Sequence, residues 1–257
     1  MNIKISNLSF KYNKKASNPV LNNINLNIKE GSVNVLLGLN GCGKTTLIKL
    51  LAGLEKPIEG NIYYNEQDLQ KMKIRERAKV FSYVPQQASV TSDVPVRQYL
   101  SYGTTNTLAF YEHPGKEEMK LVEETAEKLN ISHLLDKNLG EISGGELQIV
   151  LIACSLIQNT PIMLLDEPTS ALDMKNQNLV LSILKDIAKE QNKTIILSSH
   201  NPNHALFLNS NVVLIHEGVI RDEGQAKDLI TVEKLIPIYG DHVCVSKDLG
   251  YEEISFK

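Results

Sequence analysis

The chain contains 257 residues, of which 42% are hydrophobic and 22% are charged, a composition that excludes general disorder and is typical of a folded globular protein. Its net charge of −3 excludes the global basic field that draws proteins to nucleic acid or anionic lipid. The longest apolar run is about half of the roughly 18 residues that a membrane span requires, and the amino terminus lacks the pattern of a signal peptide. Because the three cysteines are scattered, we expect a reducing, cytoplasmic environment.

Apolar patterns predict an α/β fold. Alternating apolar and polar residues predict half-exposed antiparallel strands at residues 3–12 and 21–28. Short apolar runs at residues 33–37, 162–165, 194–197 and 212–215 are typical of buried parallel strands. Helical stretches between these runs indicate crossover helices. Asp222-Glu223-Gly224 is interpreted as a turn.

The middle of the chain has a different pattern. Residues 116–129 place apolar side chains at helical spacing among Glu and Lys, which predicts a solvated amphipathic helix. Ser143 is predicted to begin a second helix, which is apolar on all sides and therefore buried. We expect a helical subdomain at residues 88–160, inserted between α/β parts at residues 1–87 and 161–230, and a C-terminal extension at residues 231–257.

A glycine-rich loop follows the apolar strand at residues 33–37. Gly38-Leu39-Asn40-Gly41-Cys42-Gly43-Lys44-Thr45 matches G-x-x-x-x-G-K-[ST], and a helix is predicted at residues 45–54. Glycines let backbone N–H groups converge on phosphate oxygens, Lys44 neutralises the outer phosphates, and the Thr45 hydroxyl binds Mg²⁺. The pattern predicts a nucleoside triphosphate site. The alternative is a glycine-rich turn that matches the motif by chance. Cys42 is either a thiol whose modification blocks this site or a spectator side chain.

Two carboxylates, Asp166 and Glu167, follow the apolar strand at residues 162–165. Ligands of open α/β sheets bind at the carboxyl ends of strands, the end at which the glycine-rich loop is also expected. Asp166 is therefore expected to hold Mg²⁺, directly or through water, and Glu167 to orient and polarise an attacking water. The alternative is two acids at an ordinary strand end.

Five further segments follow a recognisable order. They are Tyr12, Gln86 in Tyr83-Val84-Pro85-Gln86, Ile142-Ser143-Gly144-Gly145-Glu146, Ser170-Ala171-Leu172-Asp173, and His200 in Ser198-Ser199-His200. They resemble the adenine-stacking aromatic residue, Q-loop, signature sequence, D-loop and switch histidine of the nucleotide-binding subunits of ATP-binding cassette (ABC) transporters. The resemblance covers essentially the whole chain. It implies a P-loop NTPase (RecA-like) core with a mainly parallel sheet, an N-terminal antiparallel β subdomain and an inserted α-helical subdomain.

The resemblance also implies an ATPase that works as a head-to-tail homodimer around two Mg–ATP. The signature sequence of each copy contacts the ATP of the other, Asp173 lies at the dimer seam, and Gln86 couples ATP occupancy to movement of the helical subdomain. Catalysis is expected from Lys44, Gln86, Glu167 and His200, and Mg²⁺ binding from Thr45, Gln86 and Asp166. The expected nucleotide contacts are Tyr12, Gly38, Asn40, Gly41, Cys42, Gly43, Lys44, Thr45, Thr46, Ser143, Gly144, Gly145 and Asp173.

A cassette without spanning segments implies separate permease subunits in the membrane. This favours an importer at the inner face of the cell membrane, served indirectly by an extracytoplasmic substrate-binding protein. Tyr83-Val84-Pro85-Gln86, Val96-Arg97-Gln98-Tyr99 with Gly103, and Ile238-Tyr239-Gly240 resemble the group that serves iron–siderophore, haem, cobalamin and molybdate uptake. Thr104 stands where relatives often carry Arg, and Leu147, Ile149 and Cys154 lie where many relatives carry arginines.

Two alternatives to transport remain at this point. One is a soluble ABC ATPase that acts on nucleic acid or ribosomes, although the acidic net charge predicts no nucleic-acid partner. The other is a regulatory cassette that binds ATP without turnover, which the presence of Glu167 and His200 disfavours.

Overall fold

A computed structural model describes residues 2–13, 17–87, 91–106, 114–170, 172–241, 243–248 and 251–256. The chain forms two compact units. The first consists of Met1–Met72 and Leu184–Lys257, and the second of Lys73–Ile183. The expected α/β class, with mostly parallel strands in the main sheet and an antiparallel N-terminal sheet, is confirmed.

The N-terminal sheet of the first unit is antiparallel, as predicted. Its strands are β1 (Asn2–Phe10), β2 (Leu21–Lys29), β4 (Glu59–Tyr64) and β5 (Gln67–Asp68), in the order β2-β1-β4-β5. Leu21, Ile24, Leu26 and Ile28 are buried, while most of the residues between them are exposed. One face of β2 therefore packs on the core, which is the reason for its alternating sequence.

Parallel strands in the first unit position the glycine-rich loop. β3 (Val33–Leu37) lies between β8 (Thr194–Ser199) and β9 (Asn211–His216) and is parallel to both, so these three predicted strands are confirmed. β10 (Val219–Gln225) pairs antiparallel with β9. The turn predicted at residues 222–224 is wrong, because the chain reverses earlier, at Glu217 and Gly218, whose φ values are 50° and 75°.

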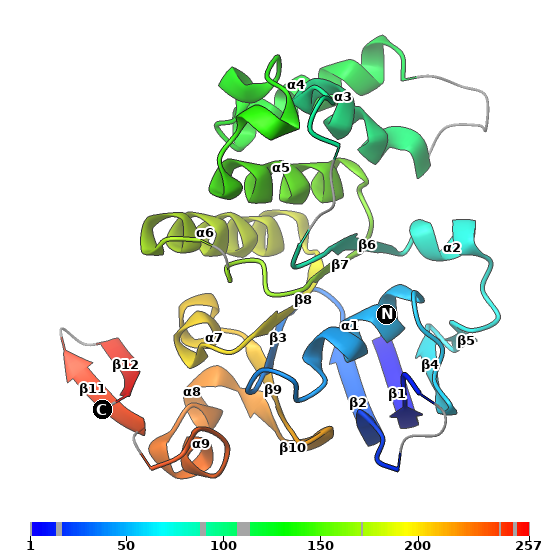
Figure 1. Cartoon of the computed structure of the whole chain (residues 1–257). Helices are drawn as coiled ribbons and strands as arrows, with labels where there is room; N and C mark the ends of the chain where they lie inside the picture. Colours follow the sequence, from blue (N-terminus) through cyan, green and yellow to red (C-terminus); the bar gives the residue numbers. More distant parts are fainter. Residues whose placement is uncertain are drawn as a thin grey trace. The chain divides into compact units, whose positions relative to one another are not determined.

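Helices and a terminal hairpin complete the first unit (Figure 1). α1 begins directly after the glycine-rich loop, close to the predicted start, and α7 follows β8. The helices are α1 (Lys44–Ala52), α7 (Pro202–Leu208), α8 (Ala226–Leu229) and α9 (Val232–Tyr239), and the hairpin strands are β11 (Val243–Asp248) and β12 (Tyr251–Phe256).

The second unit is mainly helical around a parallel pair of strands. Its strands β6 (Phe81–Val84) and β7 (Ile162–Leu165) pair in parallel. Its helices are α2 (Ile74–Ala78), α3 (Val96–Ser101), α4 (Lys116–Lys128) and α5 (Gly144–Ile157), with short 3₁₀ turns at Tyr102–Asn106, Ser132–Leu134 and Leu139–Glu141. α6 (Met174–Gln191) begins in this unit and ends in the first. The predicted solvated helix is α4, and the predicted buried helix is α5.

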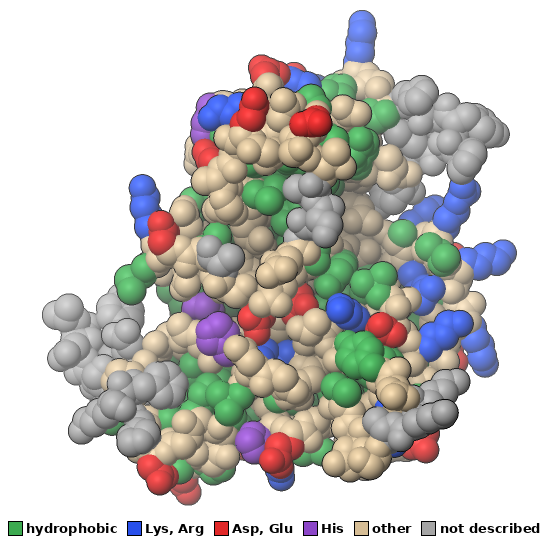
Figure 2. All heavy atoms as spheres, in the orientation of Figure 1, with side chains coloured by type: hydrophobic (Ala, Val, Ile, Leu, Met, Phe, Trp, Pro, Cys, Tyr) green, Lys and Arg blue, Asp and Glu red, His purple; other side chains and the backbone are tan. Residues whose placement is uncertain are grey.

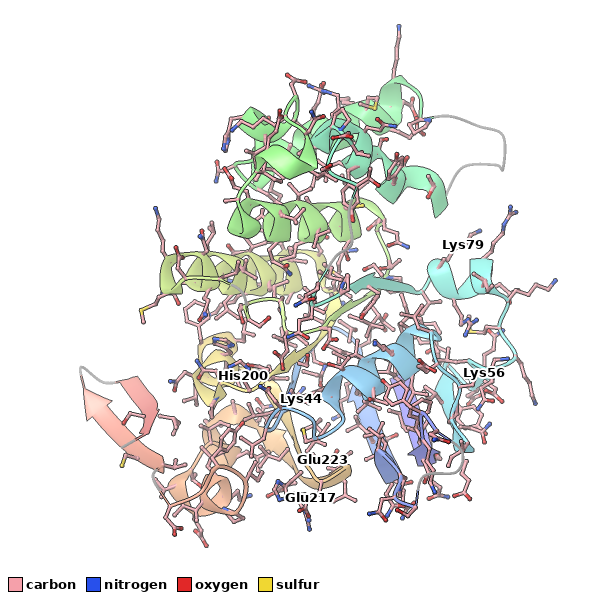
Figure 3. The ribbon with its side chains drawn as sticks, in the orientation of Figure 1. Lys44, Lys56, Lys79, His200, Glu217 and Glu223 are labelled. Atoms are coloured by element: carbon pink, nitrogen blue, oxygen red, sulfur yellow. The ribbon has the colours of Figure 1, made fainter. Side chains whose placement is uncertain are left out.

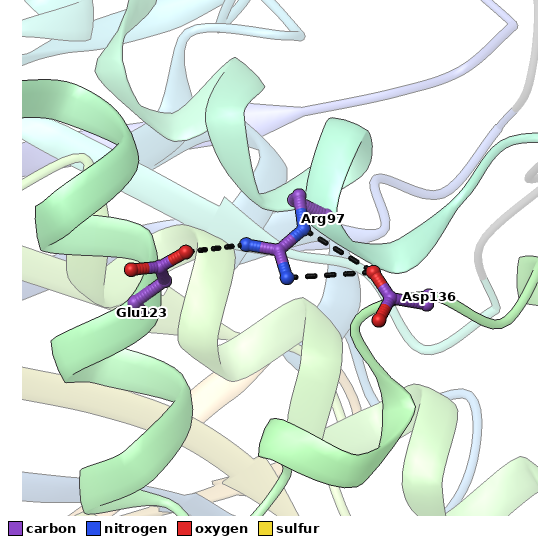
Figure 4. A network of polar contacts seen from close by, with 3 residues as sticks. All are labelled: Arg97, Glu123 and Asp136. Carbon is purple, nitrogen blue, oxygen red and sulfur yellow. Dashed lines mark hydrogen bonds and ion pairs between the residues drawn. The ribbon is translucent and has the colours of Figure 1, made fainter. Parts of the chain in front are cut away.

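Arg97 on α3 connects three segments of the second unit (Figure 4). Its guanidinium lies 2.7 Å from Glu123 of α4 and 3.4 Å from Asp136. Below this network α5 is buried along most of its length. Burial raises the pKa of the Cys154 thiol to about 11, and its sulfur donates to the Tyr99 carbonyl. Apolar packing therefore surrounds most of α5.

The described helices include none that is both long and apolar enough to cross a membrane. The face drawn in Figure 2 carries charged side chains of both signs together with small groups of hydrophobic ones.

Candidate functional site

The glycine-rich loop leaves β3 beside the end of β8. Leu37 and Ser199 are partners in the parallel ladder, and the Gly38 N–H donates to the Ser199 carbonyl at 3.4 Å. A Cβ atom on Gly38 would lie 2.2 Å from the carbonyl oxygen of Ile215, so only glycine permits this close approach. The strand register therefore places the loop next to the segment that carries His200.

The Lys44 side chain folds back into the loop. Its Nζ donates to the carbonyl oxygens of Gly38 and Leu39, each at 2.9 Å, and the residue is 4% exposed. These partners compensate for the desolvation of a buried ammonium group. Gly43, with φ 109°, is the N-cap of α1. A positive charge and a helix N-terminus thus lie in one loop, an arrangement that binds phosphate.

Tyr12 lies two residues beyond β1 and contacts α1. The residue is 57% exposed, and its ring stands edge-on to that of Phe10, with centroids 4.9 Å apart. Its hydroxyl lies 3.2 Å from Oγ1 of Thr46. An exposed aromatic ring beside this helix offers a face on which a base can stack. Cys42, in contrast, is buried.

The segment after β8 is held by a network of polar side chains. Ser199 Oγ accepts from the Asn201 backbone N–H and lies near Nδ1 of His204, both at 3.0 Å. Asn201 also accepts from the Asn203 N–H and caps α7. Burial, helped by the charge of His200, lowers the pKa of His204 to about 4. The network fixes the backbone on both sides of His200, which is labelled in Figure 3.

Ser199 was quoted only as part of the His200 motif, and Asn201 and His204 were not among the predicted site residues. Asn followed by Pro at the start of a helix is an N-cap signal that identifies Asn201. No pattern indicates that His204 turns inward, where it is 7% exposed.

The second unit places both predicted carboxylates directly after β7. Asp166 is 1% exposed, and its backbone N–H donates to the Val84 carbonyl. Glu167 has a φ of 42°, a left-handed conformation that residues other than glycine seldom adopt. Gln86, which follows β6, donates from Nε2 to Oε2 of Glu167 at 3.1 Å. Parallel pairing of β6 and β7 thus brings together two predicted residues from distant parts of the sequence.

The segment that resembles the signature sequence begins α5. Ser143 is the N-cap, and its N–H and hydroxyl both donate to the Glu146 carboxylate at 2.8 Å. The backbone hydrogen bond from Ser143 is the largest cause that lowers the pKa of Glu146. Glu146 thus completes a capping box, in which the Ser143 N–H is already hydrogen-bonded within the chain. A Cβ atom on Gly144 would meet nothing within 4 Å, whereas one on Gly145 would lie 2.8 Å from the Asn176 amide nitrogen.

Asp173 caps a helix in this chain. Its Oδ1 accepts from the Asn176 N–H at 2.8 Å in the first turn of α6. This contact within the chain was not expected, although Asp before a helix is a common N-cap signal. Ala171, in the segment that resembles the D-loop, lies outside the described residues.

Oxygen donors for a divalent cation occur among the predicted residues. Thr45 supplies a hydroxyl, Asp166 a buried carboxylate, and Gln86 an amide oxygen, since its nitrogen bonds Glu167. Hard oxygen donors, few in number and combined with phosphate oxygens, are the ligands that Mg²⁺ prefers. The chemistry of these donors, one from the first unit and two from the second, therefore suits Mg²⁺.

Comparisons with known proteins agree with this geometry. A family model described as ABC transporter matches residues 21–170. The chain is 36% identical to an uncharacterized ABC transporter ATP-binding protein of Haemophilus influenzae, with 93% of this chain and 89% of that protein covered. It is 33% identical to a probable iron chelatin transport ATP-binding protein of Helicobacter pylori, with 93% of each chain covered.

Solved structures share the fold. A metal-chelate-type ABC transporter in an inward-facing conformation matches with a TM-score of 0.84 at 27% identity, covering 99% of this chain and 96% of that one. A dimeric ATP-binding cassette bound to ADP and phosphate matches with a TM-score of 0.78 at 27% identity, covering 87% and 98%. The chain therefore belongs to the ABC transporter family, as one of its ATP-binding ATPase cassettes.

Proposed function

We propose that this chain is the ATPase subunit of a multi-subunit importer, in which two copies bind Mg–ATP head to tail and drive separate permease subunits. The observation that carries the proposal is the loop geometry of the first unit. A buried lysine, a helix N-terminus and the His200 segment are assembled there by the register of β3 and β8. The family membership supplies the context of transport.

Each predicted residue has a role in this proposal. Lys44 and the loop N–H groups bind the phosphates, and Tyr12 stacks on adenine. Glu167 orients the attacking water, and the Gln86 amide that bonds its carboxylate holds it in place. His200 donates a hydrogen bond to the γ-phosphate. Thr45, Asp166 and Gln86 would hold Mg²⁺, which would supply positive charge that neutralises the phosphates.

The proposed dimer uses the signature segment of each copy. Gly144 and Gly145 lie in the first turn of α5, where backbone N–H groups and the helix dipole favour an anion. Ser143, the N-cap of α5, holds the start of this turn through its hydrogen bonds to Glu146. Asp173 lies at the seam between the copies. The solved dimeric cassette with ADP and phosphate supports a paired arrangement.

The proposed permease contact lies on the helical unit. A pocket of about 480 Å³ there is lined by residues of α3, α4 and the segment around Leu135, including Arg97 and Met119. A mixed apolar and charged lining suits a short helix of a membrane subunit. We infer a metal chelate, cobalamin or molybdate as the cargo class, because the relatives include proteins named for iron chelatin and molybdate import. A substrate-binding protein outside the membrane would deliver the cargo, and the chain would lie at the inner membrane face.

The test of the ATPase role is Glu167→Gln. The substitution retains an oxygen that accepts the Gln86 hydrogen bond and removes the charge that polarises water. We expect ATP hydrolysis to stop and an ATP-bound dimer to accumulate, measured by size-exclusion chromatography with light scattering. Glu66→Gln in a surface turn is the matched control. A Glu167→Gln chain that stays monomeric at saturating Mg–ATP would contradict the proposal.

The test of the transport role is purification from native membranes. The tagged chain is isolated in mild detergent, and its partners are identified by mass spectrometry. We expect a polytopic membrane protein in stoichiometric amount. Recovery with ribosomes or nucleic acid instead would favour the non-transport alternative, which the relatives do not favour.

A further inference from the structure

The C-terminal extension contacts the backbone of the switch residue. Tyr239, the last residue of α9, donates its hydroxyl hydrogen to the carbonyl oxygen of His200 at 3.1 Å. The two residues are separated by 39 positions and meet within the first unit. His200 follows directly after β8, so its backbone connects the strand to α7.

We propose that Tyr239 is a positioning residue for ATP hydrolysis: its hydroxyl fixes the His200 carbonyl and thereby the direction in which the imidazole points. The proposal rests on the proposed role of His200 at the γ-phosphate. A hydrogen bond to the carbonyl restricts rotation of the peptide that follows His200. Such restriction keeps a catalytic group in its productive orientation before substrate binds.

The surroundings of Tyr239 suit this role. Burial raises the pKa of its phenol, and the charge of the nearby Cys42 thiol adds to this effect. The phenol therefore stays protonated, and remains a donor, across the physiological pH range.

α9 is anchored firmly enough to hold a side chain in place. Lys234 near its start forms an ion pair with Asp222 of β10 at 2.6 Å, and Leu235 and Ile238 are buried. Farther along the extension, the side-chain amide of Asn203 on α7 bonds the backbone of Ile254 in β12: its Nδ2 donates to the Ile254 carbonyl at 3.0 Å, and its Oδ1 accepts from the Ile254 N–H at 2.8 Å.

These contacts connect the extension to the chain at His200 and again at Asn203, three residues later. Tyr239 bonds His200, two residues before α7, and Asn203 within α7 bonds Ile254 of the extension. The segment that carries His200 is thereby held on one side by β8 and on the other by the extension.

The test is Tyr239→Phe, which removes only the hydroxyl. We expect kcat for ATP hydrolysis to fall about three- to tenfold, the effect of losing one hydrogen bond that orients the catalytic group. We expect KM for ATP to change less than about twofold and the melting temperature to stay nearly unchanged. Tyr63→Phe on β4, half-buried and in the same unit, is the matched control and is expected to behave as wild type.

A double variant distinguishes positioning from general packing. If Tyr239 acts through His200, then Tyr239→Phe lowers the single-turnover rate of wild type but not that of His200→Ala. An unchanged kcat in Tyr239→Phe, a loss confined to KM, or an equal loss in the His200→Ala background would each overturn the inference. A His200→Ala chain with wild-type kcat would instead overturn the proposed role of His200 itself.

Discussion

Gly144→Ala separates the proposed role of the signature turn from the stability of the chain. Gly144 is the first residue of α5, its φ is not left-handed, and an added Cβ would meet nothing within 4 Å. Replacing glycine by alanine in a helix stabilises it by about 0.5 to 1 kcal/mol. For a chain of this size we expect the melting temperature to rise by about 1 to 4 °C. The isolated chain is therefore expected to gain stability.

The same methyl group is expected to abolish ATP-dependent pairing. In the proposed dimer the phosphate of the partner's ATP approaches this turn closely enough for N–H contacts, which leaves no room for a side chain. The assay is light scattering in the Glu167→Gln background with Mg–ATP, combined with a thermal melt. Asn178→Ala on the exposed part of α6 provides a comparable gain in helix propensity away from the turn. A Gly144→Ala chain that pairs normally, or that melts lower than wild type, would refute this reasoning.

Three further predictions concern other parts of the chain. Gly38→Ala is expected to cost about 1 to 3 kcal/mol and to abolish ATP binding, because its Cβ would collide with the Ile215 carbonyl; urea unfolding and ATP titration measure both. Arg97→Ala is expected to cost at most about 1 kcal/mol, less in high salt, since its pair with Glu123 is partly exposed; an equal loss at both salt concentrations would contradict this. His204 has a folded-state pKa of about 4, below its unfolded value, so the unfolded chain binds the proton first as pH falls. Between pH 6.5 and 4.5 wild type is expected to lose about 2 to 3 kcal/mol more than His204→Gln, measured by urea unfolding, and parallel losses would disprove the burial effect.

Elements with strong local patterns were predicted correctly. The buried strands β3, β7, β8 and β9 are nearly continuous apolar runs, and this pattern follows from burial of both faces of a parallel strand. The capping signal at Ser143 identified the start of α5. β10 was missed because its residues are mostly exposed or half-exposed, so its pairing with β9 leaves no apolar alternation in the sequence.

The residues of the site were predicted from the sequence, but the hydrogen bonds that connect them were not. The Gln86–Glu167 hydrogen bond depends on the pairing of β6 with β7, and β6 was not among the predicted strands. The left-handed φ of Glu167 has no sequence signal, since the residue is not glycine. The bond from Tyr239 to the His200 carbonyl joins a side chain to a backbone atom, and no residue pattern records such a contact.

The exposed ring of Tyr12 offers a direct optical signal for ligand binding. The chain contains no tryptophan, so its emission comes from tyrosine alone. Tyr12→Trp would introduce a single indole at an exposed position near α1. Stacking of a nucleobase on that indole would quench its fluorescence against a dark background. Because the chain has no tryptophan of its own, the fluorescence of this one indole would report nucleotide association in real time.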